Sequence, residues 1–195
     1  MKKLVLICFA LLSTRCFSQS LVKGIVSRIS FGLKAGVNYS DYTNADFKTD
    51  ALIGFHAGAL VNFKLTKNLS IQEEFLFSSQ GAKVKGDLFG QENVKVNYFT
   101  VPFLLKYRTD FGLYIDAGPQ FGYRLNENTD KEQIGEFAKQ LDLAAVGGLG
   151  YQLKCGLGIE ARYMAGLSKV GDFQLSNVKT DFRSNVIQGS IFYIF

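Results

Sequence analysis

The residues with the clearest capacity for acid–base chemistry in this 195-residue sequence are His56 and the polar side chains that precede it. His56 is the only histidine, and Ser40, Asp41 and Asp50 lie in the stretch before it. A hydrolase or acyltransferase needs a general base beside a nucleophile or an activated water, and these residue types could supply one. A histidine that is hydrogen-bonded within a polar interior explains the same residues, and we favour that interpretation. A lone histidine has no metal-ligand spacing, and no cofactor or metal is predicted.

The second group with chemical potential is a pair of opposite charges, Glu160 and Arg162, in the stretch GIEARYMAGLS at 158–168. Every second residue of this stretch, from Ile159 to Leu167, is an apolar side chain or alanine. That period of two is typical of a β-strand with one apolar face. The element that positions the charges is therefore a strand, and its charged face needs a place away from the apolar one.

The N-terminal residues predict export from the cytoplasm. Residues 1–18 begin with Lys2 and Lys3, continue with a short apolar stretch from Leu4 to Leu12, and end at a cleavage site with small residues. Cleavage after Ser18 would lower the formal net charge from +5 to about +2. Because no cluster of lysine and arginine remains, no nucleic-acid partner is predicted.

Cleavage also decides the cysteine chemistry. Two of the three cysteines, Cys8 and Cys16, would leave with the signal peptide. Cys155 would remain, and a single thiol forms neither an internal disulfide nor a cysteine-based zinc site. We interpret Cys155 as a turn residue.

Eight segments of the mature chain have the period of two. They are 31–39, 54–64, 69–80, 96–107, 112–124, 142–153, 156–168 and 185–195. Each is close to the 9–11 or so residues that a tilted strand needs to cross a bilayer. The connections alternate between long (40–53, 81–95, 125–141, 169–184) and short (65–68, 108–111, 154–155). Outer-membrane barrels have an even strand number, short periplasmic turns and longer outer loops. The sequence thus predicts an all-β, eight-stranded antiparallel up-and-down transmembrane barrel with four longer extracellular loops.

The domain organisation follows from these segments. We predict a signal peptide at 1–18, a periplasmic N-terminal segment at 19–30 and the outer-membrane barrel at 31–195. The protein would lie in the cell outer membrane, with outer-membrane lipid as its first partner.

The two faces of the strands differ in composition. One face carries the apolar and aromatic side chains, and the other mixes polar residues with many glycines. A soluble barrel would enclose the apolar face around a ligand, but glycine offers nothing to solvent and instead makes room beside long side chains in a narrow lumen. We therefore predict that the polar face points inward as a structural lumen network. Its members would be Lys34, Glu74, Lys106, Asp116, Arg124, Asp142, Glu160, Arg162 and Gln188.

Three particular expectations accompany this assignment. Glu74 and Arg162 should meet within hydrogen-bond distance, because the two lie at about mid-height on strands that run in the same direction. Glu73 falls on the lipid face near the periplasmic end, where a charge costs less. Pro102 lies inside a strand, where it removes a ladder hydrogen bond, so a bulge is expected there.

Several stretches resemble a known family, the PorT-like outer-membrane β-barrel proteins of Bacteroidota. They are EFLFSSQGAK (74–83), YFTVPFLLKY (98–107), AGPQFGY (117–123), DLAAVGGLGY (142–151) and ARYMAGLS (161–168). The resemblance implies an eight-stranded barrel with mostly unassigned functions. It also implies that the C-terminal QGSIFYIF is an insertion signal for the barrel-insertion machinery, through Gln188, Tyr193 and Phe195. Ser190 stands where that signal usually has glycine.

Three functions remain open at this point. The first is a structural or surface-binding barrel with a plugged lumen and no enzymatic chemistry. The second is a small channel or a component of a protein-secretion system with an unidentified extracellular or secretion-system partner. The third is a membrane-embedded hydrolase or acyltransferase that uses His56.

Overall fold

The structure, a computed structural model, describes residues 24, 26–43, 48–86, 90–129, 141–168 and 183–195. The predicted signal peptide therefore lies outside the described residues. Eight strands account for most of the described chain, and their bounds are β1 (Ile29–Thr43), β2 (Lys48–Lys64), β3 (Leu69–Gly86), β4 (Gly90–Arg108), β5 (Leu113–Thr129), β6 (Leu141–Gln152), β7 (Leu157–Gly166) and β8 (Arg183–Ile194). Among the described residues, no helix is both long and apolar enough to span a membrane.

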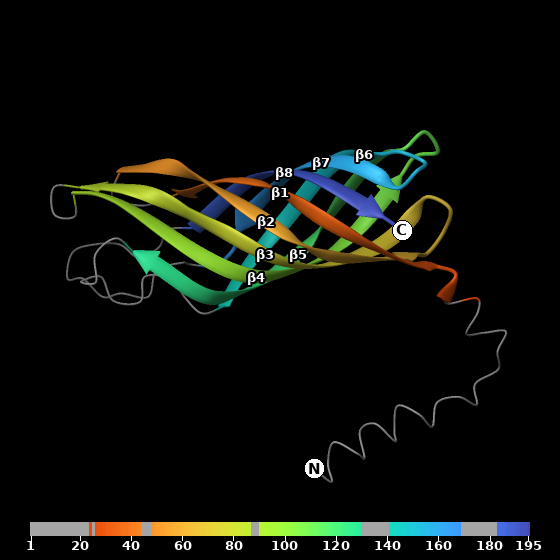
Figure 1. Cartoon of the computed structure of the whole chain (residues 1–195), viewed down its shortest axis with the longest axis horizontal. Coiled ribbons are helices and arrows are strands. Elements are labelled where there is room, and N and C mark those ends of the chain that lie inside the picture. Colours follow the sequence, from red (N-terminus) through yellow and green to blue (C-terminus); the bar gives the residue numbers. More distant parts are fainter. Residues whose placement is uncertain (1–23, 25, 44–47, 87–89, 130–140, 169–182) are drawn as a thin grey trace, which may run out of the picture.

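The strands form one closed barrel in sequence order. Each strand pairs with its neighbours in the antiparallel sense, and β1 pairs with β8 to close the sheet, for example through Lys34 and Phe192. Figure 1 shows an elongated barrel in which the start of β1 and the end of β8 lie at the same end as the short connections. The predicted fold class is confirmed. We call this end the turn end, and the opposite end the loop end.

The strands extend further toward the loop end than the sequence predicts. β2 to β5 have 17 to 19 residues, whereas β6 to β8 have 10 to 12. Much of the predicted loops 40–53 and 81–95 is therefore strand, and β5 continues to Thr129. Polar residues such as Lys95 break the apolar alternation, so the sequence predicts a loop there, although backbone pairing with the neighbouring strands continues past them. The barrel wall is consequently taller on the β2–β5 side.

The direction of the side chains agrees with the predicted orientation. In β7, buried and exposed residues alternate along nearly the whole strand, because successive side chains of a strand point to opposite faces. Apolar side chains such as Phe31, Val37 and Ile159 are exposed on the outside, while Lys34 and Glu74 are buried inside. The inward placement of the polar face is therefore confirmed.

The bulge expected at Pro102 is wrong. Pro102 is buried and pairs with Gln120, and the register of β4 with both neighbours is the same on either side of it. The ladder is instead displaced between Asn97 and Tyr98 of β4, and between Ala51 and His56 of β2. A proline removes one donor but does not by itself insert a residue, so the pairing passes it unchanged.

Two of the short connections share one turn geometry. Gly112 and Gly156 have φ values of 106° and 96°, in the left-handed region that glycine adopts without strain. Each donates its backbone N–H to a carbonyl three residues earlier, at Thr109 and Leu153. Cys155 is exposed in the second of these turns, as predicted. These tight turns fix the register of β4 with β5 and of β6 with β7, and so set the heights of the lumen side chains.

Candidate functional site

The centre of the lumen holds five charged side chains that we call the ionic cluster: Lys34, Glu74, Asp116, Glu160 and Arg162. All five are almost fully buried, with at most 5 % of each residue exposed. Arg162 donates from its two terminal nitrogens to the two oxygens of Glu74 over 2.7 and 2.8 Å, so the predicted contact is confirmed. Lys34 Nζ lies 2.8 Å from Glu160 Oε1 and 3.3 Å from Glu74 Oε1. Paired charge-assisted hydrogen bonds of this kind are the strong ones.

Arg162 is the hub of the cluster. One terminal nitrogen also donates to Asp116 over 2.9 Å and to Glu160 over 3.2 Å, and its Nε forms a further ion pair with Glu160. The five residues come from β1, β3, β5 and β7, which are alternate strands around the barrel. The cluster therefore joins opposite walls of the lumen.

Glycines on the intervening strands make these contacts possible. Gly148 of β6 pairs with Asp116 on one side and Arg162 on the other, and Gly150 likewise lies between Tyr114 and Glu160. An added Cβ at Gly148 would lie 2.6 Å from Arg162 Cγ. Because real Cβ atoms do not approach that closely, side chains from β5 and β7 can meet over β6 only where β6 has none. The role predicted for the lumen glycines is therefore confirmed at these positions.

Neutral groups hold the ionic cluster from the turn-end side. Tyr114 Oη donates to Glu160 over 2.6 Å, and Gln72 Nε2 donates to Glu74 over 2.6 Å. Lys106 Nζ donates to Gln72 Oε1 over 3.2 Å and lies 3.7 Å from the centre of the Tyr114 ring. A ring face attracts a cation electrostatically, so Lys106 is held beside the cluster without touching a carboxylate.

Apolar side chains occupy the lumen on both sides of these polar groups. Leu60, Tyr114 and Phe192 form one buried group toward the turn end. A second group, toward the loop end, consists of Leu104, Ala144, Val146, Met164 and Val186. Eight strands enclose a lumen that side chains can just fill, and here apolar groups supply part of that filling.

His56 belongs to a separate chain of hydrogen-bonded side chains on the loop-end side of the ionic cluster. Its Nδ1 lies 2.7 Å from Asn38 Oδ1 and its Nε2 lies 2.8 Å from Ser190 Oγ. Gly36 of β1 pairs with both His56 and Ser190, so this contact also crosses a glycine. The order serine, histidine, amide oxygen is that of a nucleophile, a base and an orienting group. The base is thus placed beside Ser190 and Asn38, whereas Ser40 donates to the backbone carbonyls of Leu52 and Gly81.

Burial argues against acyl transfer at this chain of residues. Ser190 is 9 % exposed and His56 and Asn38 are 1 % exposed, so an acyl substrate has little access to the hydroxyl. Asn38 also receives a hydrogen bond from Gln188 and donates to Ser78. These side chains therefore satisfy one another's hydrogen-bonding groups, which supports the interpretation of His56 as a structural residue of the polar interior.

The structure brings together most of the predicted lumen residues but not all. Lys34, Glu74, Asp116, Glu160 and Arg162 form the ionic cluster, Lys106 lies beside it, and Gln188 joins the His56 chain. Arg124 and Asp142 share the inward parity but lie toward the loop end. Arg124 is eight residues beyond Asp116 along β5, which is about 26 Å of strand. Asp142 is six residues from Gly148 along β6, about 20 Å, and accepts a hydrogen bond from Ser168.

Gln72 also belongs to the inward-facing polar set that the alternation predicts, although it is not among the charged members of the predicted network. The alternation also places Tyr114 on the inward face, but the prediction missed this residue because an aromatic side chain reads as apolar when charge is the criterion. No group of three metal-ligating side chains occurs in the described part of the chain.

A closed antiparallel barrel with an apolar outer surface and an ionic interior is the architecture of an integral membrane β-barrel. The family comparison makes this specific. The model of the family described as outer membrane protein beta-barrel domain matches residues 17–172, and the chain belongs to that family. Its location is the outer membrane. A search of curated proteins found no match.

Solved structures with the same fold are small outer-membrane barrels. Neisserial surface protein A has a TM-score of 0.55 and 12% identity, over 86% of this chain and 97% of that one. Ail, the attachment invasion locus protein of Yersinia pestis, has a TM-score of 0.51 and 15% identity, over 85% and 98%. OprG of Pseudomonas aeruginosa has a TM-score of 0.50 and 13% identity, over 85% and 95%. At these identities the likeness concerns the fold alone.

Proposed function

We propose that this protein is a non-conducting, non-enzymatic outer-membrane barrel whose lumen is plugged by its own side chains. In this proposal the barrel is a rigid anchor, and contacts with molecules outside the cell are made at the loop end. The taller wall formed by β2–β5 supports the proposed contacts at the loop end, because these strands extend beyond the length that a bilayer requires.

The observation that carries the proposal is the ionic cluster. Its side chains come from four alternate strands and meet near the axis, with each carboxylate bonded to at least one cation and no exposed member. An ion that crossed the barrel would have to separate Arg162 from Glu74 or pass apolar side chains such as Leu104. Breaking a buried ion pair costs about 3–5 kcal/mol, which opposes steady conduction.

The experiment is conductance in planar bilayers. We expect the mature wild-type barrel to give no steady ion-conducting state. The double variant Glu74→Ala/Arg162→Ala removes the two side chains that span the lumen and is expected to conduct. Glu73→Ala, which changes the neighbouring outward-facing carboxylate, should stay silent like the wild type. Heat-dependent mobility on gels would verify that every variant is folded.

A steady open state of the wild-type protein would contradict the proposal and favour a small channel or a translocation component. If neither the wild type nor the double variant conducts, the ionic cluster is not the barrier to ions. Another part of the lumen would then close the barrel.

The proposal extends to biogenesis and to the narrower family. Residues 1–18 would be a cleaved signal peptide, and Gln188, Tyr193 and Phe195 would be read by the barrel-insertion machinery. In support, Gln188 is buried, whereas Tyr193 and Phe195 are exposed and their ring centres lie 5.3 Å apart, so the two aromatic side chains are accessible together. Membership of the PorT-like group rests on the sequence stretches quoted above. N-terminal sequencing of the membrane-inserted protein would locate the cleavage site.

A further inference from the structure

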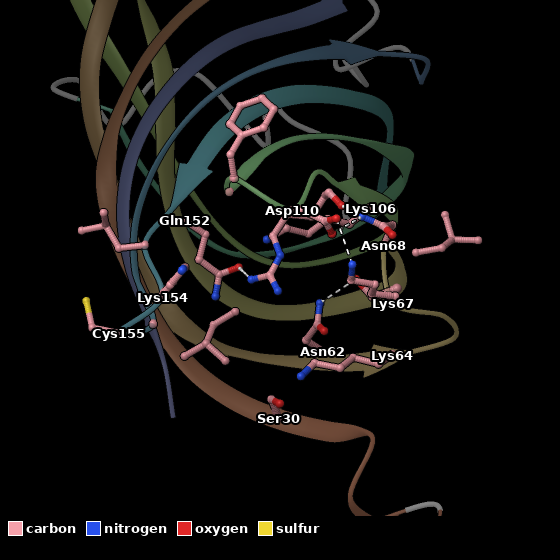
Figure 2. Close-up of a pocket in the computed structure, with 18 of the residues that line it drawn as sticks. Ser30, Asn62, Lys64, Lys67, Asn68, Lys106, Asp110, Gln152, Lys154 and Cys155 are labelled. Carbon is pink, nitrogen blue, oxygen red and sulfur yellow. Dashed lines mark hydrogen bonds and ion pairs between the residues drawn. The ribbon is translucent and has the colours of Figure 1, made fainter.

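A cavity of about 440 Å³ opens at the turn end of the barrel. Its walls come from the three short connections and from the adjoining ends of β1, β2, β3, β4, β6 and β8. Figure 2 looks into it, with Lys67 and Asn68 on one side and Gln152 and Lys154 on the other. We call this cavity the vestibule. Because outer-membrane barrels place their short turns in the periplasm, the vestibule faces the periplasm.

The vestibule has a strong excess of positive charge. The cationic side chains that line it are Lys64, Lys67, Lys106, Arg108 and Lys154. Among the described lining residues, Asp110 has the one carboxylate side chain, and it is already bound to Lys67 at 2.9 Å and Asn68 at 3.2 Å. The remaining cations are not neutralised by this single pair.

Among the cationic residues that line the vestibule, Arg108 has the contacts that best indicate a ligand site. Its Nη1 donates to Gln152 Oε1 over 3.0 Å, which is a contact with a neutral amide. In the described part of the structure, no carboxylate lies within ion-pair distance of this guanidinium. A guanidinium presents a planar set of donors that suits a carboxylate or phosphate group. The half-buried side chain therefore keeps donors and a full charge for a ligand in the cavity.

Lys106 forms the floor between the vestibule and the ionic cluster. It is 2 % exposed, and its ammonium group lies against the rings of Tyr114 and Phe192. The cluster beyond it has three carboxylates and two cations, so the charge of Lys106 is balanced from inside. The unbalanced charge of the vestibule consequently comes from Lys64, Arg108 and Lys154, which surround the open part.

We propose that the vestibule binds a small, multiply charged oxyanion that carries carboxylate or phosphate groups. The volume is within the range of small-molecule sites, which is roughly 300–1,000 Å³. Asn62, Ser70 and Gln152 add neutral hydrogen-bonding groups to the same walls. This site lies on the periplasmic side of the plug and does not require the lumen to be closed.

Calorimetric titration of the full mature barrel in an uncharged detergent tests this inference, with citrate as the carboxylate probe and pyrophosphate as the phosphate probe. We expect saturable binding of one molecule per barrel that weakens as sodium chloride screens the charges. The double variant Arg108→Gln/Lys154→Gln should weaken binding by at least about tenfold, since it removes charge-assisted hydrogen bonds. Tighter binding of one probe would identify the preferred group.

Two further variants keep the test selective. Lys95→Gln makes the same type of charge change on an exposed residue near the loop end and should leave the affinity unchanged. Asp110→Asn removes the competing carboxylate and should strengthen binding by roughly two- to fivefold. Absence of saturable binding by both probes would overturn the proposal. An equal loss in Lys95→Gln and in the Arg108/Lys154 double variant would also overturn it, because binding would then reflect net charge alone.

Discussion

Arg162 on β7 reaches Asp116 on β5 across the width of β6, because the residue between them is Gly148. The same arrangement lets Tyr114 meet Glu160 across Gly150, and His56 meet Ser190 across Gly36. Each contact joins strands that are not neighbours. The lumen of this barrel is thus organised by positions that have no side chain as much as by those that do.

The contact between Arg162 and Asp116 across Gly148 predicts the effect of adding a side chain at that glycine. Gly148→Ala would place a Cβ 2.6 Å from Arg162 Cγ and 2.8 Å from Asp116 Oδ1. We expect a loss of about 1–3 kcal/mol in the free energy of unfolding, as is typical of overpacked interiors. Urea unfolding of the barrel in lipid vesicles measures this free energy. Circular dichroism is a suitable signal because the chain has no tryptophan.

The adjacent residue is a matched control for this substitution. Gly147 points outward and an added Cβ there would meet nothing within 4 Å. Gly147→Ala should therefore leave the unfolding midpoint unchanged or raise it slightly, because alanine restricts the unfolded chain. Equal losses from the two substitutions would mean that β6 needs glycine for its backbone and not for the contacts across it.

Glu74 should be essential for stability because it receives both Arg162 and Lys34. Glu74→Gln leaves two buried cations short of a carboxylate and should lower the free energy of unfolding by about 3–5 kcal/mol. The neighbouring Glu73→Gln alters an outward-facing carboxylate and should change it by less than about 0.5 kcal/mol. If the two variants unfold at the same denaturant concentration, the ionic cluster does not stabilise the barrel.

Ser190 should be chemically unreactive despite its hydrogen bond to His56. A fluorophosphonate probe, which labels activated serine hydroxyls, is expected to leave the folded barrel unlabelled because Ser190 is buried. A soluble serine hydrolase in the same assay serves as the positive control. Labelling that disappears in both Ser190→Ala and His56→Gln would contradict the non-enzymatic function and support the hydrolase alternative.

The turn end has a titratable contact that can be measured directly. Lys67 joins two turns by donating to Asp110, and this hydrogen bond, with one from Asn68, lowers the pKa of Asp110 below its usual value. A depressed pKa means that the contact stabilises the folded state fully above the unfolded pKa and is lost as the pH falls through the folded pKa. We expect Lys67→Gln to raise the pKa of Asp110 in a carbon-13 NMR titration.

A second lysine separates the hydrogen bond from general charge. Lys64 lines the same cavity but is not a hydrogen-bond donor to Asp110 in the described contacts, so Lys64→Gln should move the pKa of Asp110 less than Lys67→Gln does. Equal shifts would assign the depressed pKa to the overall positive charge of the vestibule.

The sequence by itself determined the number of strands and their inward and outward faces. These features depend on a local property: side chains alternate along a strand, so residues such as Ile159 and Glu160 must point to opposite faces. The lumen glycines were also readable, because glycine is unsuited to an exposed strand.

Only the tertiary structure decided which inward residues share a height in the barrel. Alternation gives Asp116 and Arg162 the same inward direction, but only the register of β5, β6 and β7 places them on either side of Gly148 at the same height. Register likewise gave His56 its partners Asn38 and Ser190, and it carried the ladder past Pro102 without a bulge. The alternation of side chains is a property of each strand alone, whereas the height of a side chain depends on how all eight strands pair when the sheet closes.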